Sequence, residues 1–290
     1  MPRGRGLATK TLSIISTCYA ILEEEQPLTV RGVCYRLFNR KLIPDMGKNS
    51  TKKISTVLTT ARERSMIPWS WIVDETREID YVNSWDDPET FIDSVTTQYR
   101  KDRWATQPER VFVVSEKGTV GGIIRPVIKD YGVPFVVYHG FGSASAVRLL
   151  ARISASDRRP LTLLYVGDHD PSGRFMSDED LPGRVVEYGG RANIERVALT
   201  ESDLADLRPS TFPASDKKDD TRYRWFTEHH GDTCCELDAL DANELRRRLE
   251  SAIVDHLDID GWGRAGSTED AELTSITDFF ATWKSWGEVA

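Results

Sequence analysis

The amino-acid sequence predicts an α/β protein, in which an α-rich amino-terminal domain precedes a parallel sheet flanked by helices. First, short apolar runs rich in β-branched residues alternate with helical patterns between residues 111 and 199. Such alternation is typical of an open parallel sheet covered on both faces. Second, residues 7–64 contain three amphipathic helical patterns instead. Third, acids follow two of the apolar runs, which places them at one edge of the sheet.

Charge divides the chain into two unequal parts. The 290 residues suffice for two domains, and 39 % apolar and 29 % charged residues are ordinary for a globular protein. Residues 1–70 hold 12 Lys/Arg and 5 Asp/Glu, a net charge of +7, so the other 220 residues carry −15 of the total of −8. A basic segment beside an acidic body predicts that the first part contacts a polyanion.

The first residues of the chain were compared with a secretory signal, which would indicate export from the cytoplasm. Arg3, Arg5 and Lys10 precede an apolar stretch at 12–22, the order found in secretory signals. Serines interrupt that stretch, however, and no small-residue cleavage site is evident. No run is long enough to span a membrane, and the four cysteines form no Cys-x-x-Cys pair. We therefore expect a cytoplasmic protein, beside the nucleoid in a prokaryote, without membrane contact.

The amino-terminal elements are predicted from helix start and stop signals. Pro27 ends the first helix, Thr29 is a good N-cap for the second, and Ser50 or Thr51 caps the third. The predicted elements are helices at 7–25, 30–40 and 51–64 and a strand pair or wing at 67–74.

The third of these helices is basic on its polar face. Its cations are Lys52, Lys53, Arg62 and Arg64. Three helices followed by a wing are typical of a winged-helix domain, which sets one helix in the DNA major groove and binds phosphates through Lys and Arg. The alternative is a helical domain whose basic face is only solvated.

The second helix carries a candidate nucleophile. Arg31 and Tyr35 lie four residues apart and hence on one helix face. A phenol, with an ordinary pKa of about 10, needs a nearby cation or metal to attack at neutral pH, and an arginine also stabilises charge on a reacting phosphate. The alternative is that Tyr35 is a core aromatic.

Three acids are predicted to meet at the sheet edge. The predicted elements are strands at 111–115, 134–138, 161–166 and 194–199 and helices at 118–131, 143–153 and 175–181. Glu116 follows the first strand, and Asp168 and Asp170 follow the third, where their spacing turns both side chains the same way. Three such carboxylates suit Mg²⁺ or Mn²⁺. Alternatively, the aspartates are a helix cap and a turn former.

The remaining segments complete the predicted organisation. Glu236 and Asp238, in a strand-like or tightly turning stretch, are possible supports for the metal site. Further predicted elements are a helix at 88–100, a loop at 207–221, a helix from a cap at Asp241 or Asn243 to 257, and a helix at 276–286. The predicted domains are a DNA-binding domain at 1–75, a connecting segment at 76–108, and the sheet domain with a helical extension at 109–290.

Two motifs resemble a known family. Glu116-Lys117 followed by Asp168-x-Asp170-x-x-Gly173 resembles a Toprim domain, which has a Rossmann-like parallel sheet. The sequence around Arg31-x-x-x-Tyr35 resembles the A subunit of topoisomerase VI and the meiotic double-strand-break transesterases. The short chain is most similar to their compact, stand-alone "mini-A" relatives. It departs from them at residues 32 and 34, where Gly and Cys replace an acid and an aromatic.

The resemblance implies a function. Tyr35 would be the nucleophile on a DNA phosphate with Arg31 beside it, and Glu116, Asp168 and Asp170 would hold Mg²⁺ (or Mn²⁺). The implied activity is cleavage of double-stranded DNA by transesterification, which leaves a covalent phosphotyrosyl link. In the family the tyrosine of one protomer works with the acids of the other, which implies a homodimer. The chain has no Gly-x-x-x-x-Gly-Lys-[Ser/Thr] loop, so any ATP dependence would need a separate ATPase partner.

Two other functions remain open on the same residues. In a hydrolytic Toprim nuclease, a metal-activated water would attack the phosphate and Tyr35 would be structural. In a non-catalytic DNA-binding module, the acids would carry no chemistry.

Overall fold

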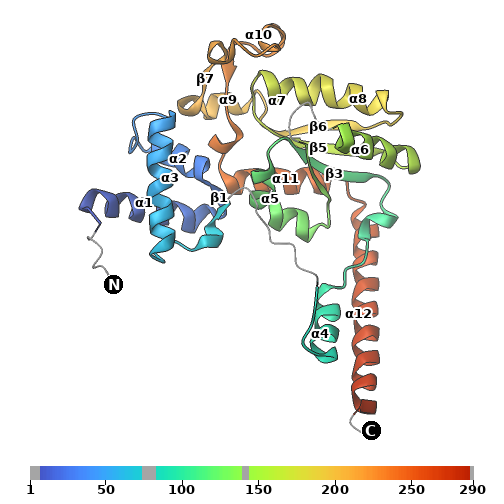
Figure 1. Ribbon diagram of the computed structural model, residues 1–290. Coiled ribbons are helices and arrows are strands. Elements are labelled where there is room, and N and C mark those ends of the chain that lie inside the picture. Colours follow the sequence, from blue (N-terminus) through green and yellow to red (C-terminus); the bar gives the residue numbers. More distant parts are fainter. Residues whose placement is uncertain (1–6, 74–82, 139–143, 288–290) are drawn as a thin grey trace. The chain divides into compact units, whose positions relative to one another are not determined.

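A computed structural model of the chain describes residues 7–73, 83–138 and 144–287 (Figure 1). It is a mixed α/β structure, mostly helical, with a four-stranded parallel sheet. Contacts divide the chain into two compact units, one made of residues 1–76 and 111–253 and the other of 77–110 and 254–290. The domain boundaries drawn from the sequence stay a prediction.

The sheet lies in the first unit and has the strand order β4-β3-β5-β6. Its pairs run parallel, with Val113 opposite Phe135 and Leu163 opposite Ile194. Every residue of β5 is buried, as expected for a strand covered on both faces. The predicted parallel sheet is therefore confirmed. Its strands are β3 (Arg110–Ser115), β4 (Phe135–Val137), β5 (Leu161–Val166) and β6 (Asn193–Ala198).

Helices cover both faces of this sheet. The chain adds β4 on one side of β3 and adds β5 and β6 on the other side. Because such connections are right-handed, their helices lie on opposite faces of the sheet. One face packs on α6 and α8 through a core that includes Phe112, Tyr165 and Leu150. On the other side, α11 is tied to α5 by the Arg246 Nε donating to the Ile123 carbonyl at 2.9 Å. The covering helices are α5 (Gly118–Asp130), α6 (Ala144–Ser156), α7 (Pro171–Phe175), a π-helical turn (Met176–Asp180), α8 (Leu181–Glu187) and α11 (Ala242–Asp255).

The strand order reverses between β3 and β5. The chain leaves β3 toward β4 on one side and returns to form β5 on the other side. In open parallel sheets, ligands bind outside the carboxyl ends of the two strands at such a reversal. The predicted acids follow these two strands, which makes this edge the candidate site.

Three helices form the amino-terminal part of the first unit, as predicted. They are α1 (Thr9–Glu25), α2 (Val30–Asn39) and α3 (Lys48–Glu63). The predicted cap of α2 is confirmed, since the Thr29 hydroxyl accepts from the Gly32 N–H at 2.8 Å. The predicted cap of the third helix is wrong: α3 starts after Gly47, whose N–H donates to Asp45 in a turn that closes before Ser50.

The strand after α3 pairs differently from the prediction. Its residues form β2 (Ile72–Val73), which pairs in parallel with β1 (Leu28–Thr29), while Trp69–Trp71 form a short 3-10 turn. Val73 is thus paired with a strand about 44 residues earlier in the chain rather than within a local hairpin. The rest of the predicted wing, from residue 74, lies outside the described residues.

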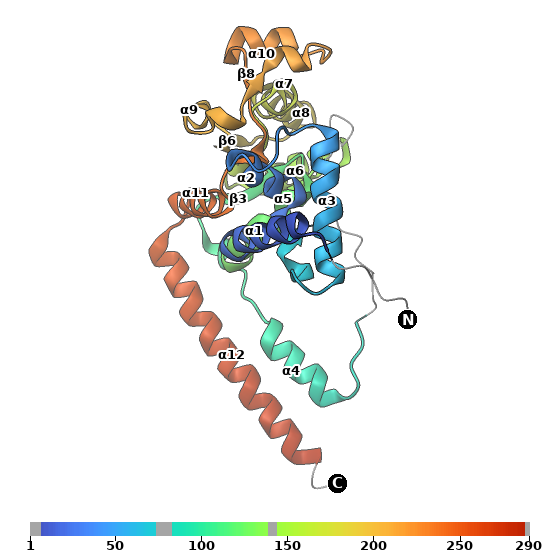
Figure 2. The same ribbon diagram turned by 90° about the vertical axis from the view of Figure 1, so that its left-hand side faces the viewer.

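The second unit consists mainly of α4 (Pro88–Gln98) and α12 (Ile259–Gly287), which contact each other (Figure 2). The prediction that the last helix starts at residue 276 is wrong. Glycines near residue 263 lower helix propensity, but packing offsets that loss: Trp262 meets Trp104 edge-on at 5.6 Å, and Arg103 bonds to Glu269 at 2.8 Å. No helix among the described residues is long and apolar enough to span a membrane.

Short elements fill residues 203–239, beyond β6. The predicted loop at 207–221 contains a strand that pairs antiparallel with another near residue 233. These elements are α9 (Asp203–Asp206), η5 (Arg208–Ser210), β7 (Phe212–Pro213), η6 (Ala214–Lys217), α10 (Tyr223–His230), β8 (Thr233–Cys234) and η7 (Leu237–Ala239); η2 (Arg103–Thr106) belongs to the second unit.

A buried ion pair locks α1 to α2. The Arg36 guanidinium donates to Glu25 at 2.7 Å, and only 7 % of Glu25 and 8 % of Arg36 are exposed. We expect Glu25→Ala to lower the free energy of unfolding by about 3–5 kcal/mol, because the guanidinium keeps its buried charge and loses its partner. Urea denaturation measures the loss, with the exposed Glu23→Ala on the same helix as control, expected within about 0.5 kcal/mol of the parent. Equal losses in both variants would contradict this account.

Candidate functional site

The loop after β5 carries two of the predicted acids. Asp168 is 6 % exposed and Asp170 is 3 % exposed. Asp170 caps α7, because its Oδ1 accepts from the Gly173 N–H at 2.7 Å. A Cβ on Gly173 would lie only 2.4 Å from the Asp168 carbonyl oxygen, so this tight turn requires glycine. The loop geometry therefore fixes both aspartates at the strand end.

Glu116 follows β3 and is half-buried beside these aspartates. Burial, and then repulsion from Asp168 and Asp170, raises the pKa of Glu116 to about 7. The repulsion means that the three predicted acids are near one another. They lie at the ends of the two neighbouring strands where the strand order reverses.

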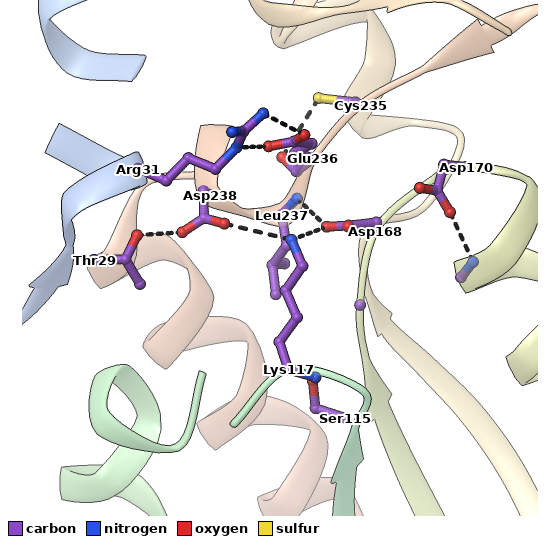
Figure 3. A network of polar contacts seen from close by, with 12 residues as sticks. Thr29, Arg31, Ser115, Lys117, Asp168, Asp170, Cys235, Glu236, Leu237 and Asp238 are labelled. Atoms are coloured by element: carbon purple, nitrogen blue, oxygen red, sulfur yellow. Dashed lines mark hydrogen bonds and ion pairs between the residues drawn. The ribbon is translucent and has the colours of Figure 1, made fainter. Parts of the chain in front are cut away.

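Two lysines neutralise the aspartates. The Lys117 ammonium donates to Asp168 at 2.7 Å and to Asp238 at 3.4 Å (Figure 3). Lys217, at the end of η6, pairs with Asp170. Burial alone would lower the pKa of Lys117, but the charges of Asp168 and Asp238 raise it, so this lysine stays charged. Each aspartate thus contacts an ammonium group.

Two features of this arrangement decide how well the acids could bind a divalent cation. Within the described ranges, no three His, Cys, Asp or Glu side chains are close enough together to hold one ion. The donors are nevertheless hard carboxylate oxygens that repel one another, the kind of set that suits Mg²⁺ or Mn²⁺. The ammonium groups of Lys117 and Lys217 supply the positive charge that a metal ion would bring. The chemistry of these donors therefore suits such an ion, but binding would require Lys117 and Lys217 to leave the aspartates and the acid side chains to draw closer together.

A segment far along the chain closes the site. Cys235 and His169 exchange two backbone hydrogen bonds of 2.9 Å each. The Leu237 N–H then donates to the Asp168 carboxylate at 2.8 Å (Figure 3). These bonds bring Glu236 and Asp238, which the sequence marked as possible supports, to the acid loop.

The same segment binds α2. Arg31 makes a two-pronged ion pair with Glu236, in which Nη2 lies 2.5 Å from Oε1. The Thr29 hydroxyl donates to Asp238, and the Arg36 guanidinium donates to the Asp238 carbonyl at 2.7 Å. The helix with the candidate nucleophile and the loop with the acids therefore belong to one polar network within a single chain.

Tyr35 lies beside Arg31, as their spacing predicts. The Arg31 guanidinium is 5.9 Å from the centre of the Tyr35 ring, and Tyr35 is 3 % exposed. Burial, and then the charge of Glu236, raises the pKa of Tyr35, although Arg31 opposes this. The phenol is thus protonated at neutral pH and covered from solvent. It must be uncovered before it can attack a substrate.

Close packing explains why a glycine occupies position 32. A Cβ there would lie 3.3 Å from the Thr29 hydroxyl and 3.4 Å from Leu28, which leaves little room for a side chain. A side chain at this position would require one of these neighbours to shift slightly. The carboxylate partner of Arg31 is Glu236.

The predicted DNA-binding cations separate into two groups. Lys52, Lys53 and Arg64 are exposed on or next to α3. The placement of Arg62 on the polar face is wrong: this side chain is 6 % exposed, and its guanidinium stacks 4.6 Å above the Trp69 ring. An arginine can cover an aromatic ring with its flat guanidinium, which helical spacing alone does not reveal.

Sequence reasoning assigned no role to either lysine of the site. Lys117 follows Glu116 directly, so its position at the strand end could have predicted that it lies beside the acids. Lys217 belongs to the charged run 216–220, which reads as an exposed loop. Only the fold of β7 and η6 brings it to Asp170.

No protein-family model matches the chain, and a search of curated proteins found no match.

Proposed function

We propose that this protein cleaves double-stranded DNA by transesterification, with Tyr35 as the nucleophile and Mg²⁺ or Mn²⁺ as the cofactor. The observation that carries the proposal is the polar network at the strand-order reversal. It joins the acids near Asp168 to the helix of Arg31 and Tyr35 through Glu236 and Asp238. A nucleophile, a cation for the phosphate and acids for a metal thus come from three separate segments, which a fourth segment at Glu236 and Asp238 joins.

In the proposed reaction, the Tyr35 oxygen forms a bond to phosphorus as a bond from phosphorus to a deoxyribose oxygen breaks. Glu236, whose charge acts on the phenol, accepts the phenolic proton, and the released deoxyribose oxygen takes up a proton. Arg31 exchanges its contact with Glu236 for one with the phosphate. A divalent cation held by Glu116, Asp168 and Asp170 would orient the phosphate and neutralise charge on it.

The finer architecture and the partners belong to the same proposal. We propose that the three amino-terminal helices form a winged-helix domain and that the sheet is a Toprim domain. Because Tyr35 is covered within its own chain, DNA or a second copy must shift α2 before attack. A symmetric homodimer, as in the resembling family, would let the tyrosine meet the acids of the partner copy. A separate ATPase could drive that shift.

One observation favours a second function, hydrolysis by metal-activated water. The Tyr35 phenol is covered and its pKa is raised, as expected of a structural tyrosine. In that mechanism the acids near Asp168 keep their role and Tyr35 has none.

Incubation of end-labelled duplex DNA with the protein tests the proposal directly. With Mg²⁺ or Mn²⁺ we expect strand breaks in which one end stays attached to protein on a denaturing gel, until protease digestion releases it. EDTA should prevent the breaks. Free ends without attached protein would favour hydrolysis, and intact DNA under all these conditions would refute both enzymatic functions.

DNA affinity should fall steeply with salt, because residues 1–70 carry a net charge of +7. Each phosphate contact contributes about −0.9 to the slope of log K against log[salt], so the double variant Lys52→Ala/Lys53→Ala should lose about 1.8 of it. Fluorescence anisotropy at several salt concentrations measures the slope. Lys129→Ala, exposed on α5, is the control and should keep the parent slope. An unchanged slope in the double variant would remove α3 from the interface.

A further inference from the structure

Arg196, on β6, lies beneath the acid loop. It pairs in register with Tyr165, and its guanidinium stacks 4.7 Å from the centre of the Tyr165 ring. Among the described residues, no carboxylate forms an ion pair with it. Burial of the guanidinium lowers the pKa of Arg196, so the fold holds a partly buried cation here without a direct counter-ion.

The guanidinium donates instead to backbone carbonyls from two segments. On the acid loop, it reaches the carbonyl of Gly173 at 2.6 Å and those of Gly167 and Asp168 at 3.2 Å each. At the end of β6, it reaches the Leu199 carbonyl at 3.0 Å. Its Nε donates to the Ser177 hydroxyl at 3.2 Å.

This arrangement sets the orientation of the loop. Three carbonyls of the 167–173 turn converge on one cation, so these oxygens are engaged and not free to bind a metal ion. The carboxylates of Asp168 and Asp170 form their contacts elsewhere, with Lys117 and Lys217. A flat guanidinium with five donors can hold several carbonyls at once, whereas the single ammonium of a lysine cannot reproduce that fork.

We propose that Arg196 is a positioning residue for Asp168 and Asp170. It binds the main chain of their turn and thereby sets the spacing at which the two carboxylates take up one divalent cation. The inference rests on the proposed function, because it assumes that these acids bind a cation. It assigns Arg196 no contact with DNA.

Titration of the DNA-free protein with Mn²⁺ tests the assignment without any activity. Calorimetry should show that Arg196→Ala binds Mn²⁺ about 10–100-fold more weakly than the parent does. This is the usual loss of metal affinity when a residue that orients metal ligands is removed. Arg196→Lys should also bind weakly although it keeps the charge, and millimolar guanidinium should restore part of the affinity of Arg196→Ala. The control is Arg152→Ala, exposed on α6, which should bind like the parent.

Amide hydrogen exchange supplies a readout independent of the metal. In EDTA, the Gly173 and Leu237 amides, which donate to Asp170 and Asp168, should exchange faster in Arg196→Lys, while β3 keeps its protection. Unchanged exchange, or parent-like Mn²⁺ affinity in both variants, overturns the assignment. If the parent binds no Mn²⁺ while these two amides still exchange faster in the variant, the positioning of the loop stands and the proposed metal function fails.

Discussion

Tyr35→Phe should remove all DNA strand breakage, including any covalent protein–DNA adduct. The substitution deletes one oxygen and keeps the buried ring, so the packing of α2 should change little. If the phenol oxygen is the nucleophile, no other atom replaces it, and cleavage should fall by at least about 10³-fold. Denaturing gels of labelled DNA with Mg²⁺, run before and after protease treatment, measure both the breaks and the adduct.

The matched control is Tyr19→Phe. Tyr19 lies on α1, is 38 % exposed and packs against Trp71, so its substitution removes a phenol from the same domain without touching the network. It should cleave like the parent. A Tyr35→Phe protein that still cuts DNA with Mg²⁺ would refute the tyrosine mechanism and leave the hydrolytic nuclease as the better account.

Asp168→Ala and Glu116→Ala should each abolish metal-dependent cleavage while the protein remains folded. Both side chains lie at strand ends, so their removal does not open the core. A neutral residue relieves repulsion among the acids, although Asp168→Ala also removes the ion pair with Lys117. Glu116 in particular is held at a raised pKa of about 7 by burial and by the other two acids, so its removal should not destabilise the metal-free protein. Calorimetric titration with Mn²⁺ should show no binding in either variant, and circular dichroism should match the parent.

Asp168 needs a finer control, because its carboxylate also accepts from the Leu237 N–H and from Lys117. Asp168→Asn keeps an acceptor for the backbone N–H but loses the charge, so it should fold normally and still fail to cleave. Asp130→Asn, exposed at the end of α5, should cleave like the parent. Full cleavage by Asp168→Asn or by Glu116→Ala would refute the metal-site assignment.

The sheet and the strand-end position of its acids could be predicted because their signal is local. Strands covered on both faces must be apolar throughout, which marks β5 in the sequence, and Asp168 follows where that run ends. The cap at Thr29 is equally local, since its partner Gly32 is three residues away. Helical spacing also places Arg31 beside Tyr35, which their 5.9 Å separation confirms.

What surrounds those acids depended on the tertiary structure. Glu236 reaches Arg31 across 205 residues, and Lys217 reaches Asp170 across 47. The early start of α12 and the burial of Arg62 against Trp69 are further examples. Local propensity and periodicity carry no record of such partners. From the sequence alone, a charged side chain is predicted to be exposed to solvent. In the folded chain an opposite charge, an aromatic ring or a set of carbonyls can lie beside it, and the energy of these contacts outweighs the preference of the charge for water.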